Sequence, residues 1–378
     1  MTAWPAVALG LIVAAIHWAH RRPGWQAAFR WLPVPLWCYA LPMLGAALGM
    51  LPPKHPVYHA LTDGLLPVAL GLLLLGVDVP AVIRAGARAL GAAAVGAAGI
   101  VAGVALWARI LHDRLPPEAW RGAGALAGTW TGGTMNLLAL RAILGTPEPM
   151  FASLIIVDAL IAYAWMALLV AASALQGPID RWLRAAPILD GPGMSPAEAG
   201  APPRGLGAQV GCALIAAALA LGARLAARHL PTSTLVSSSS GWTVVLVTTA
   251  ALGLSLLASV RRLGSSGNAL GYSALYLALA ATGAQASLTA LWSAPVWIVV
   301  GIGTAAVHGL ALLAAGRLFR IPLGLLATAS QANIGGVVSA PLVGAVYHQS
   351  LAPVGLLLAM LGNALGTYLG VWSAALCR

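Results

Sequence analysis

Two segments of the sequence place paired glycines among hydroxyl and amide side chains. One runs from Gly128 to Asn136 and reads GTWTGGTMN, and the other runs from Ala329 to Ser339 and reads ASQANIGGVVS. Glycines let the backbone approach a ligand closely, and they break helices so that half-helix ends are exposed to a ligand. Freed carbonyls beside Thr, Ser and Asn oxygens suit Na⁺, while half-helix N-termini attract anions. The predicted binding residues are Thr129, Thr131, Gly132, Gly133, Thr134, Asn136, Ser330, Gln331, Asn333, Gly335 and Gly336.

Close helix packing is the alternative explanation for such glycines. Small residues allow helix backbones to touch, and polar side chains can form hydrogen bonds across the contact. A single glycine pair would favour this alternative. The sequence contains two matched polar pairs, Gly132–Gly133 and Gly335–Gly336, and therefore favours a binding site.

A carboxylate inside an apolar segment is the second indication of chemistry. Asp158 lies near the middle of segment 149–174, where a charged side chain costs at least about 2.5–3.5 kcal/mol. We predict that Asp158 helps to bind a coupling proton or Na⁺, with a neutral, hydrogen-bonded structural Asp as the alternative. Asn363, its counterpart in the second half, joins the predicted site. The other acidic residues lie in loops or near segment ends, and none follows Glu198, so a second-half ion site must use neutral oxygens.

The composition shows whether the protein is surrounded by water or by a membrane. Of 378 residues, 60% are apolar and 8% are charged, and the mean hydropathy is +0.89. An ordinary soluble domain carries about 25% charged residues, so a soluble enzyme, a disordered protein and a nucleic-acid-binding protein are excluded. The net charge of +11 comes from short basic clusters between apolar runs, such as Arg21–Arg22 and Arg261–Arg262. Such clusters are typical of loops that anchor membrane helices.

Twelve apolar segments approach the length of about 20 residues that a helix needs to cross a membrane. They are 3–19, 34–51, 65–80, 89–111, 122–144, 149–174, 206–228, 242–260, 268–287, 292–314, 321–345 and 350–376. A polar stretch rich in proline and glycine separates six segments from six. We therefore predict a first transmembrane repeat at 1–175, an interdomain linker at 176–205 and a second transmembrane repeat at 206–378.

The two halves share short patterns at nearly constant spacing. DALIAY at Asp158 recurs as NALGTY at Asn363, 205 residues later, and the two glycine pairs are 203 residues apart. Gly76-Val77-Asp78 also matches Gly283-Ala284-Gln285, at a spacing of 207 residues. Transporter halves are often related by inverted topology, which requires an odd number of crossings in each half. Re-entrant segments at 122–144 and 321–345 would meet this requirement.

The predicted fold is therefore an all-α membrane protein with two inverted-topology repeats. Each repeat has about five transmembrane helices plus one re-entrant or broken helix. With the N-terminus outside, this topology places twelve Lys and Arg residues inside and eight outside. Twelve full crossings with the N-terminus inside give the same ratio, but they place Arg21 and Arg22 outside and do not allow inversion.

The glycine-pair segments make the chain similar to the YjcL-like family of uncharacterised membrane proteins, which is related to sodium–glutamate symporters and to the cation/proton-antiporter and anion-transporter superfamily. The matching residues are Gly128–Asn136 and Ser330–Gly336. The resemblance implies inverted repeats, two re-entrant or broken helices that cross at mid-membrane, a homodimer and an elevator-like motion. Val337 stands where a proline is expected after the second pair. The substrate of the family is not established.

Our leading hypothesis is a secondary transporter, coupled to Na⁺ or H⁺, for a small anionic organic solute. We expect it in the bacterial cytoplasmic membrane, in contact with lipid, as a homodimer without nucleic acid and without a cofactor other than Na⁺. The sequence lacks HExxH, DDxxD, GxxxxGK[ST] and CxxC motifs, so we do not expect an enzyme. The alternatives are an accessory or channel-like membrane protein and a membrane enzyme. An enzyme would need another ionisable group near Asp158 or near His308, which lies in the middle of its segment. For His308 itself we expect a structural role as a hydrogen-bonding residue.

Overall fold

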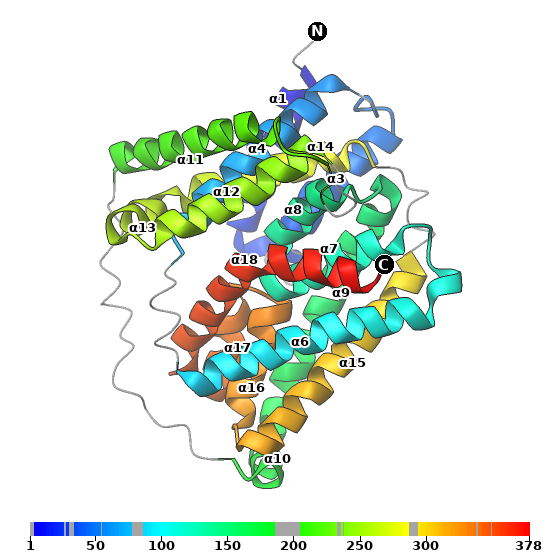
Figure 1. Ribbon diagram of the computed structural model, residues 1–378, viewed down its shortest axis with the longest axis vertical. Helices are drawn as coiled ribbons and strands as arrows, with labels where there is room; N and C mark the ends of the chain where they lie inside the picture. The colour runs from blue at the N-terminus through cyan, green and yellow to red at the C-terminus, as the bar shows by residue number, and fades with distance from the viewer. Residues whose placement is uncertain are drawn as a thin grey trace. The chain divides into compact units, whose positions relative to one another are not determined.

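The protein is predominantly helical in the part that the computed structural model describes. That part comprises residues 4–25, 28–29, 34–53, 55–77, 86–185, 205–232, 236, 238–286, 294–337, 339–348 and 350–378. It contains α-helices and short 3-10 helices and no β-strand (Figure 1). In its described part, each of the twelve predicted apolar segments overlaps a helix, so the predicted all-α class is confirmed.

Several helices could span a membrane. Among the described residues, six helices are long and apolar enough to do so. They are α4 (Pro56–Leu74), α6 (Ala87–Ile110), α9 (Glu148–Ala172), α11 (Leu206–Ala227), α15 (Ala294–Phe319) and α18 (Leu351–Leu376). A seventh span arises if α12 (Ser239–Ser255) is joined to the following α13 (Ala258–Gly264) and α14 (Asn268–Gly283), across a bend of 116°. The helices α1 (Trp4–His20) and α3 (Val34–Ala47) are apolar but shorter.

The order of helices recurs along the chain. The first half contains α7 (Ala119–Gly132) and α8 (Thr134–Leu144), and the second half contains α16 (Leu323–Ile334) and α17 (Ser339–Tyr347). Because α16 begins 204 residues after α7, and α17 begins 205 residues after α8, the spacing matches that of the sequence patterns. Likewise, α9 and α18 begin 203 residues apart.

The chain forms two compact units, and each unit draws on both halves of the sequence. Unit 1 comprises residues 1–76, 141–159 and 203–295, and unit 2 comprises residues 77–140, 160–202 and 296–378. Of the predicted linker 176–205, residues 176–183 form α10 (Gln176–Leu183), and residues 186–204 lie outside the described part. The division into two repeats and a linker therefore remains a prediction.

Unit 1 is held together by helix contacts that depend on small residues. Helix α4 packs against α11, α12 and α14, and α3 packs against α14. A Cβ placed on Gly283 would lie 2.2 Å from the carbonyl oxygen of Tyr39. Close backbone contact of this kind is common between membrane helices, where packing rather than water drives association.

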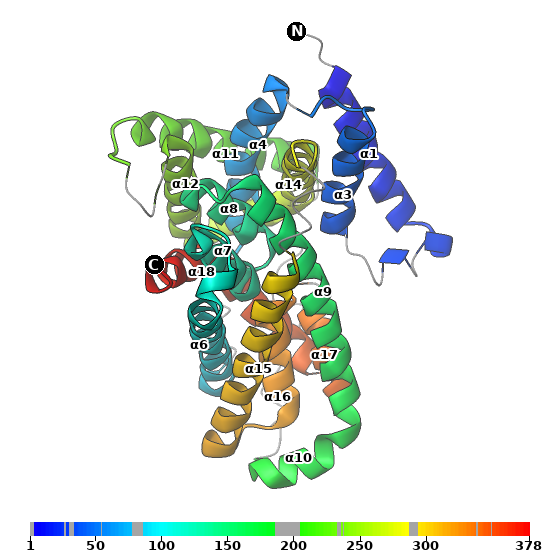
Figure 2. The same ribbon diagram turned by 90° about the vertical axis from the view of Figure 1, so that its right-hand side faces the viewer.

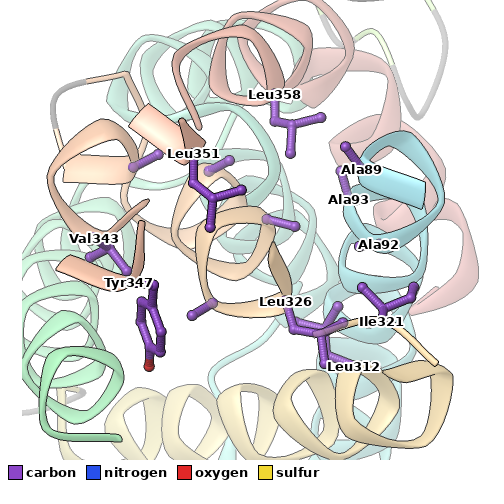
Figure 3. Close-up of a cluster of buried hydrophobic side chains, with 14 of the residues drawn as sticks. Ala89, Ala92, Ala93, Leu312, Ile321, Leu326, Val343, Tyr347, Leu351 and Leu358 are labelled. Carbon is purple, nitrogen blue, oxygen red and sulfur yellow. The ribbon is translucent and has the colours of Figure 1, made fainter. Parts of the chain in front are cut away.

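Unit 2 has an apolar cluster that supports the second glycine-pair segment. Helix α16 contacts α6, α7, α17 and α18, and Figures 1 and 2 show it alongside α15. Leu326 of α16, Leu312 of α15 and Leu358 of α18 are among the buried side chains of the cluster (Figure 3). The hydroxyl of Tyr347, on α17, donates a hydrogen bond to the carbonyl of Leu169 on α9. These contacts fix α16 and α17 within unit 2.

Candidate ion- and solute-binding site

The first glycine-pair segment folds back on itself. Helix α7 ends at Gly132, Gly133 has a φ of +79°, and α8 begins at Thr134. A Cβ placed on Gly128 would lie 1.9 Å from Leu140 Cδ1. Twelve residues of straight helix would span about 18 Å, so α8 runs back along α7 as a helical hairpin.

The second glycine-pair segment forms a hairpin of the same kind. Gly336 has a φ of +83° and separates α16 from α17. Nε2 of Gln331 donates a hydrogen bond of 2.9 Å to Oγ of Ser339 across the turn. Further from the turn, a Cβ on Gly344 would lie 3.2 Å from Thr328 Oγ1. The hairpin therefore forms with Val337, rather than proline, after the glycine pair.

The two glycines of each pair meet different structural requirements. The second glycine, Gly133 or Gly336, adopts a positive φ that strains residues with a Cβ. The first glycine is needed for space: a Cβ on Gly132 would lie 2.3 Å from the carbonyl oxygen of Gly362, and one on Gly335 would lie 1.9 Å from Gln331 Nε2. Close packing, the alternative raised for these glycines, thus accounts for Gly132, whereas the atoms nearest a Cβ on Gly335 belong to side chains of its own hairpin.

Helices α7 and α18 meet through glycines spaced four residues apart on both. A Cβ on Gly366 would lie 2.8 Å from the carbonyl oxygen of Gly128, and one on Gly370 would lie 2.8 Å from that of Gly124. Moving four residues forward on α18 corresponds to moving four residues back on α7, as expected for antiparallel helices. The contact positions the first hairpin against α18.

We expect Gly366→Ala to lower the free energy of unfolding by about 1–3 kcal/mol, because the added methyl group meets backbone atoms that cannot rotate away. Thermal unfolding of the purified protein measures this effect. Gly222→Ala in α11 is the matched control, since a Cβ there has no other atom within 4 Å. Equal stability of the two variants would contradict the packing of α7 on α18.

Most polar side chains of the first hairpin are already hydrogen-bonded. Nδ2 of Asn136 donates to the carbonyls of Gly132 (2.6 Å) and Asn363 (3.3 Å), and its Oδ1 accepts from the hydroxyl of Thr367. The Thr131 hydroxyl donates to the carbonyl of Ala127. These two predicted binding residues therefore stabilise the hairpin in this structure. Asn363 lies at the tip, since a Cβ on Gly133 would be 3.5 Å from Asn363 Oδ1.

One oxygen in each hairpin is buried without a hydrogen-bond partner among the described residues. In the first hairpin it is Oγ1 of Thr129, four residues before Gly133, and in the second it is Oε1 of Gln331, five residues before Gly336. Both side chains are 1% exposed. An unsatisfied buried polar group costs about 1–3 kcal/mol. Each oxygen therefore lies close to its turn with hydrogen-bonding capacity that the described residues leave unused.

Comparison with known proteins places the chain in a family. Residues 7–378 match the family described as "Protein of unknown function (DUF819)". The chain belongs to this family. It is also 24% identical over 389 residues to the "Uncharacterized membrane protein YjcL" of Bacillus subtilis (strain 168), an alignment that covers 98% of this chain and 94% of that protein. The resemblance to the YjcL-like family is thus confirmed, and this DUF819 member is a membrane protein with several candidate spans.

In this DUF819 member, the second hairpin is joined to its neighbours by a hydrogen-bonded chain around His308. Nδ1 of His308 lies 2.8 Å from the carbonyl oxygen of Gly96, and Nε2 lies 2.8 Å from Oγ of Ser330. Nε1 of Trp165 donates to the same Ser330 oxygen at 2.8 Å. Because a carbonyl can only accept, the network assigns the proton to Nδ1, and a neutral ring then accepts the Ser330 hydroxyl at Nε2. This arrangement agrees with the structural role expected for His308.

The remaining predicted site residues differ in their surroundings. Nδ2 of Asn333 donates to the carbonyl of Ala93 on α6, at 3.1 Å, and Thr134 is half-buried at the start of α8. Asp158 is half-buried on the part of α9 that belongs to unit 1, whereas the other predicted site residues belong to unit 2. The role of Asp158 in ion binding therefore stays a prediction. Asp78, from the repeat comparison, lies outside the described residues.

The sequence analysis missed a charged group inside unit 1. Arg141, near the end of α8, forms an ion pair with Glu148, the first residue of α9. The hydroxyl of Tyr39 donates 2.8 Å to the other carboxylate oxygen, and the Arg141 guanidinium lies 4.7 Å from the centre of the Phe151 ring. The available signal was the seven-residue spacing of Arg141 and Glu148 across a short Gly–Thr–Pro loop.

Proposed function

We propose that this protein is a secondary transporter, coupled to Na⁺ or H⁺, that carries a small anionic organic solute across the bacterial cytoplasmic membrane. One observation carries the proposal. Unit 2 contains two hairpins at matching sequence positions, and each combines a glycine of positive φ with an oxygen buried without a partner in the described residues, Thr129 Oγ1 or Gln331 Oε1. A bound ion or solute would supply the missing partners.

The ends of the four helices explain why both a cation and an anion could bind. At each hairpin tip, a helix C-terminus from α7 or α16 meets a helix N-terminus from α8 or α17. C-terminal carbonyls carry partial negative charge and favour a cation, while N-terminal amides favour an anion. Neutral oxygens such as those of Thr129 and Gln331 are suitable ligands for Na⁺. We propose that Asp158 contributes to binding the coupling ion.

The composition of the two units supports inverted repeats and an elevator-like motion. Unit 1 combines α1, α3 and α4 with α11–α14, and unit 2 combines the first hairpin with the second. Two structural repeats that each contribute equivalent helices to both units would give this composition. We propose that the two hairpins of unit 2 carry the solute and that the protein acts as a homodimer.

Thermal stability with and without ions tests the proposal. A ligand that binds only the folded protein stabilises it by about 2.7 kcal/mol at a hundred times its dissociation constant. If the coupling ion is Na⁺, we expect NaCl to raise the melting temperature relative to choline chloride. If it is a proton, we expect a shift to lower pH to raise the melting temperature. A panel of small carboxylates then identifies the solute. A wild-type protein that responds neither to Na⁺ nor to protons would contradict the proposal.

Thr129→Val should remove most of the ion response, because it deletes the unpartnered oxygen and keeps the side-chain shape. Thr248→Val is the matched control: its hydroxyl is also buried without a partner among the described residues, but it lies on α12 in unit 1. We expect Thr248→Val to respond as the wild type does. Asp158→Asn should weaken the response as well, and an unchanged response in both Thr129→Val and Asp158→Asn would refute the proposed site.

The hydrogen bonds of His308 do not favour the alternative of a membrane enzyme. That alternative needs a second ionisable side chain near His308 or Asp158. Both ring nitrogens of His308 instead contact neutral groups, the Gly96 carbonyl and the Ser330 hydroxyl. We therefore retain the transporter as the proposed function.

A further inference from the structure

A basic hollow lies at one end of unit 2, away from the hairpin turns. It has a volume of about 660 Å³ and is lined by Trp182, Arg184, Ala314, Arg317, Leu318 and Arg320. These residues come from the end of α10 and the end of α15, which lie together in Figures 1 and 2. The hollow is open rather than enclosed.

The hollow carries positive charge without a matching negative charge. Neither a hydrogen bond nor an ion pair joins the side chains of Arg184, Arg317 or Arg320 to another residue in the described ranges. Asp180 on α10 is not among the residues that line the hollow, and one of its carboxylate oxygens accepts the backbone N–H of Leu323 at 2.7 Å. Three guanidinium groups can therefore face the same bound anion.

The backbone holds two of these arginines in an unusual conformation. Arg184 has a φ of +52° and Arg320 has a φ of +55°, and each directly follows a helix. Glycine is the usual residue at such a position, because a Cβ is disfavoured there. Arginine at both positions directs two cationic side chains to one hollow, at the expense of local backbone strain.

The surrounding side chains match the interfacial region of a membrane. Helix α15 is a candidate span that ends at Phe319, so a membrane crossed by this helix would have its headgroups near the arginines. Trp182 is 57% exposed and Leu318 is 73% exposed. Exposed Trp beside basic residues is typical of membrane interfaces, and basic pockets at the ends of spans bind anionic lipid headgroups.

We propose that this hollow binds the headgroup of an anionic phospholipid. The guanidinium groups of Arg184, Arg317 and Arg320 bind the phosphate, which their paired N–H donors match in geometry. Trp182 and Leu318 contact the glycerol and the first part of the acyl chains. This site is independent of the proposed transport function.

Lipid binding to the detergent-purified full-length protein tests the proposal. We expect short-chain phosphatidylglycerol to raise the melting temperature more than phosphatidylcholine does, and native mass spectrometry to detect retained phosphatidylglycerol. In R184Q/R317Q/R320Q the affinity for phosphatidylglycerol should fall on the order of a hundredfold, since each basic residue near an anionic surface contributes about fivefold. The single variant R320Q should fall by about fivefold, and it keeps the test valid if the triple variant does not fold.

The matched control is R88Q/R109Q/R114Q, which removes three exposed arginines of unit 2 that do not line the hollow. It should bind phosphatidylglycerol as the wild type does. Sodium phosphate alone separates a lipid site from a site for free anions. Equal responses to phosphate and to phosphatidylglycerol, or equal lipid binding by the R184Q/R317Q/R320Q variant and the control, would overturn the proposal.

Discussion

Replacing Glu148 with Gln is expected to lower the free energy of unfolding by about 2–3 kcal/mol. The substitution leaves the Arg141 guanidinium without its counter-charge in a site where both side chains are only 21% exposed. It also weakens the hydrogen bond from the Tyr39 hydroxyl. Removing one partner of a largely buried ion pair is costly, because the remaining charge stays desolvated. Chemical or thermal unfolding of the variant in detergent measures the change.

Glu118→Gln is the control for this prediction. Glu118 pairs with Arg121 three residues away, and the Glu118 side chain is 48% exposed. Exposed pairs contribute about 0–1 kcal/mol, so the control should be nearly as stable as the wild type. Equal losses in the two variants would show that the Arg141–Glu148 pair is not a stabilising contact. Loss of the ion response without loss of stability would instead assign Glu148 to transport.

Replacing Ser330 with Ala is expected to destabilise the protein by about 2–4 kcal/mol. The Ser330 hydroxyl is the shared partner of Trp165 Nε1 and His308 Nε2. His308 is fully buried, so water cannot take the place of the lost hydroxyl, and each unsatisfied buried group costs about 1–3 kcal/mol. Thermal unfolding measures the loss, and Trp fluorescence reports the change around Trp165.

Ser255→Ala provides the comparison for Ser330→Ala. Ser255 is equally buried, but its hydroxyl donates only to the carbonyl of Leu252 within its own helix. Its removal should therefore cost about 1 kcal/mol or less. Ser330→Thr retains a hydroxyl and should recover much of the stability lost in Ser330→Ala. If Ser330→Ala were as stable as Ser255→Ala, the hydrogen-bonded chain from Trp165 to His308 would not support the second hairpin.

The positions of the hairpin turns could be predicted from the sequence. A turn between two helix segments needs a residue that adopts a positive φ, and glycine does so without strain. Gly133 and Gly336 are the second members of the two predicted pairs, and both have this conformation. The class of protein could also be predicted, because 8% charged residues cannot form a water-facing surface around a chain of this length.

The partners of the polar side chains could not be predicted in the same way. Asn136 and Thr131 are suitable Na⁺ ligands by type, yet Thr131 is hydrogen-bonded within α7, and Asn136 is hydrogen-bonded within the hairpin and to α18. Thr129 and Gln331 each keep an oxygen without a partner in the described residues. Spacing along a helix shows which side chains share a face, but it does not show which of them the neighbouring helices satisfy.

The sequence by itself determined that the protein lies in a membrane, which segments are helical and where the two hairpins turn. It could do so because composition and the conformational freedom of glycine are local properties. Tertiary structure decided which groups meet. Thr367 bonds to Asn136 across 231 positions, and Trp165 bonds to Ser330 across 165. It also brought Arg141 and Glu148 to Tyr39, and three arginines to one hollow. These contacts depend on how helices distant in the sequence pack, and no local pattern specifies that packing.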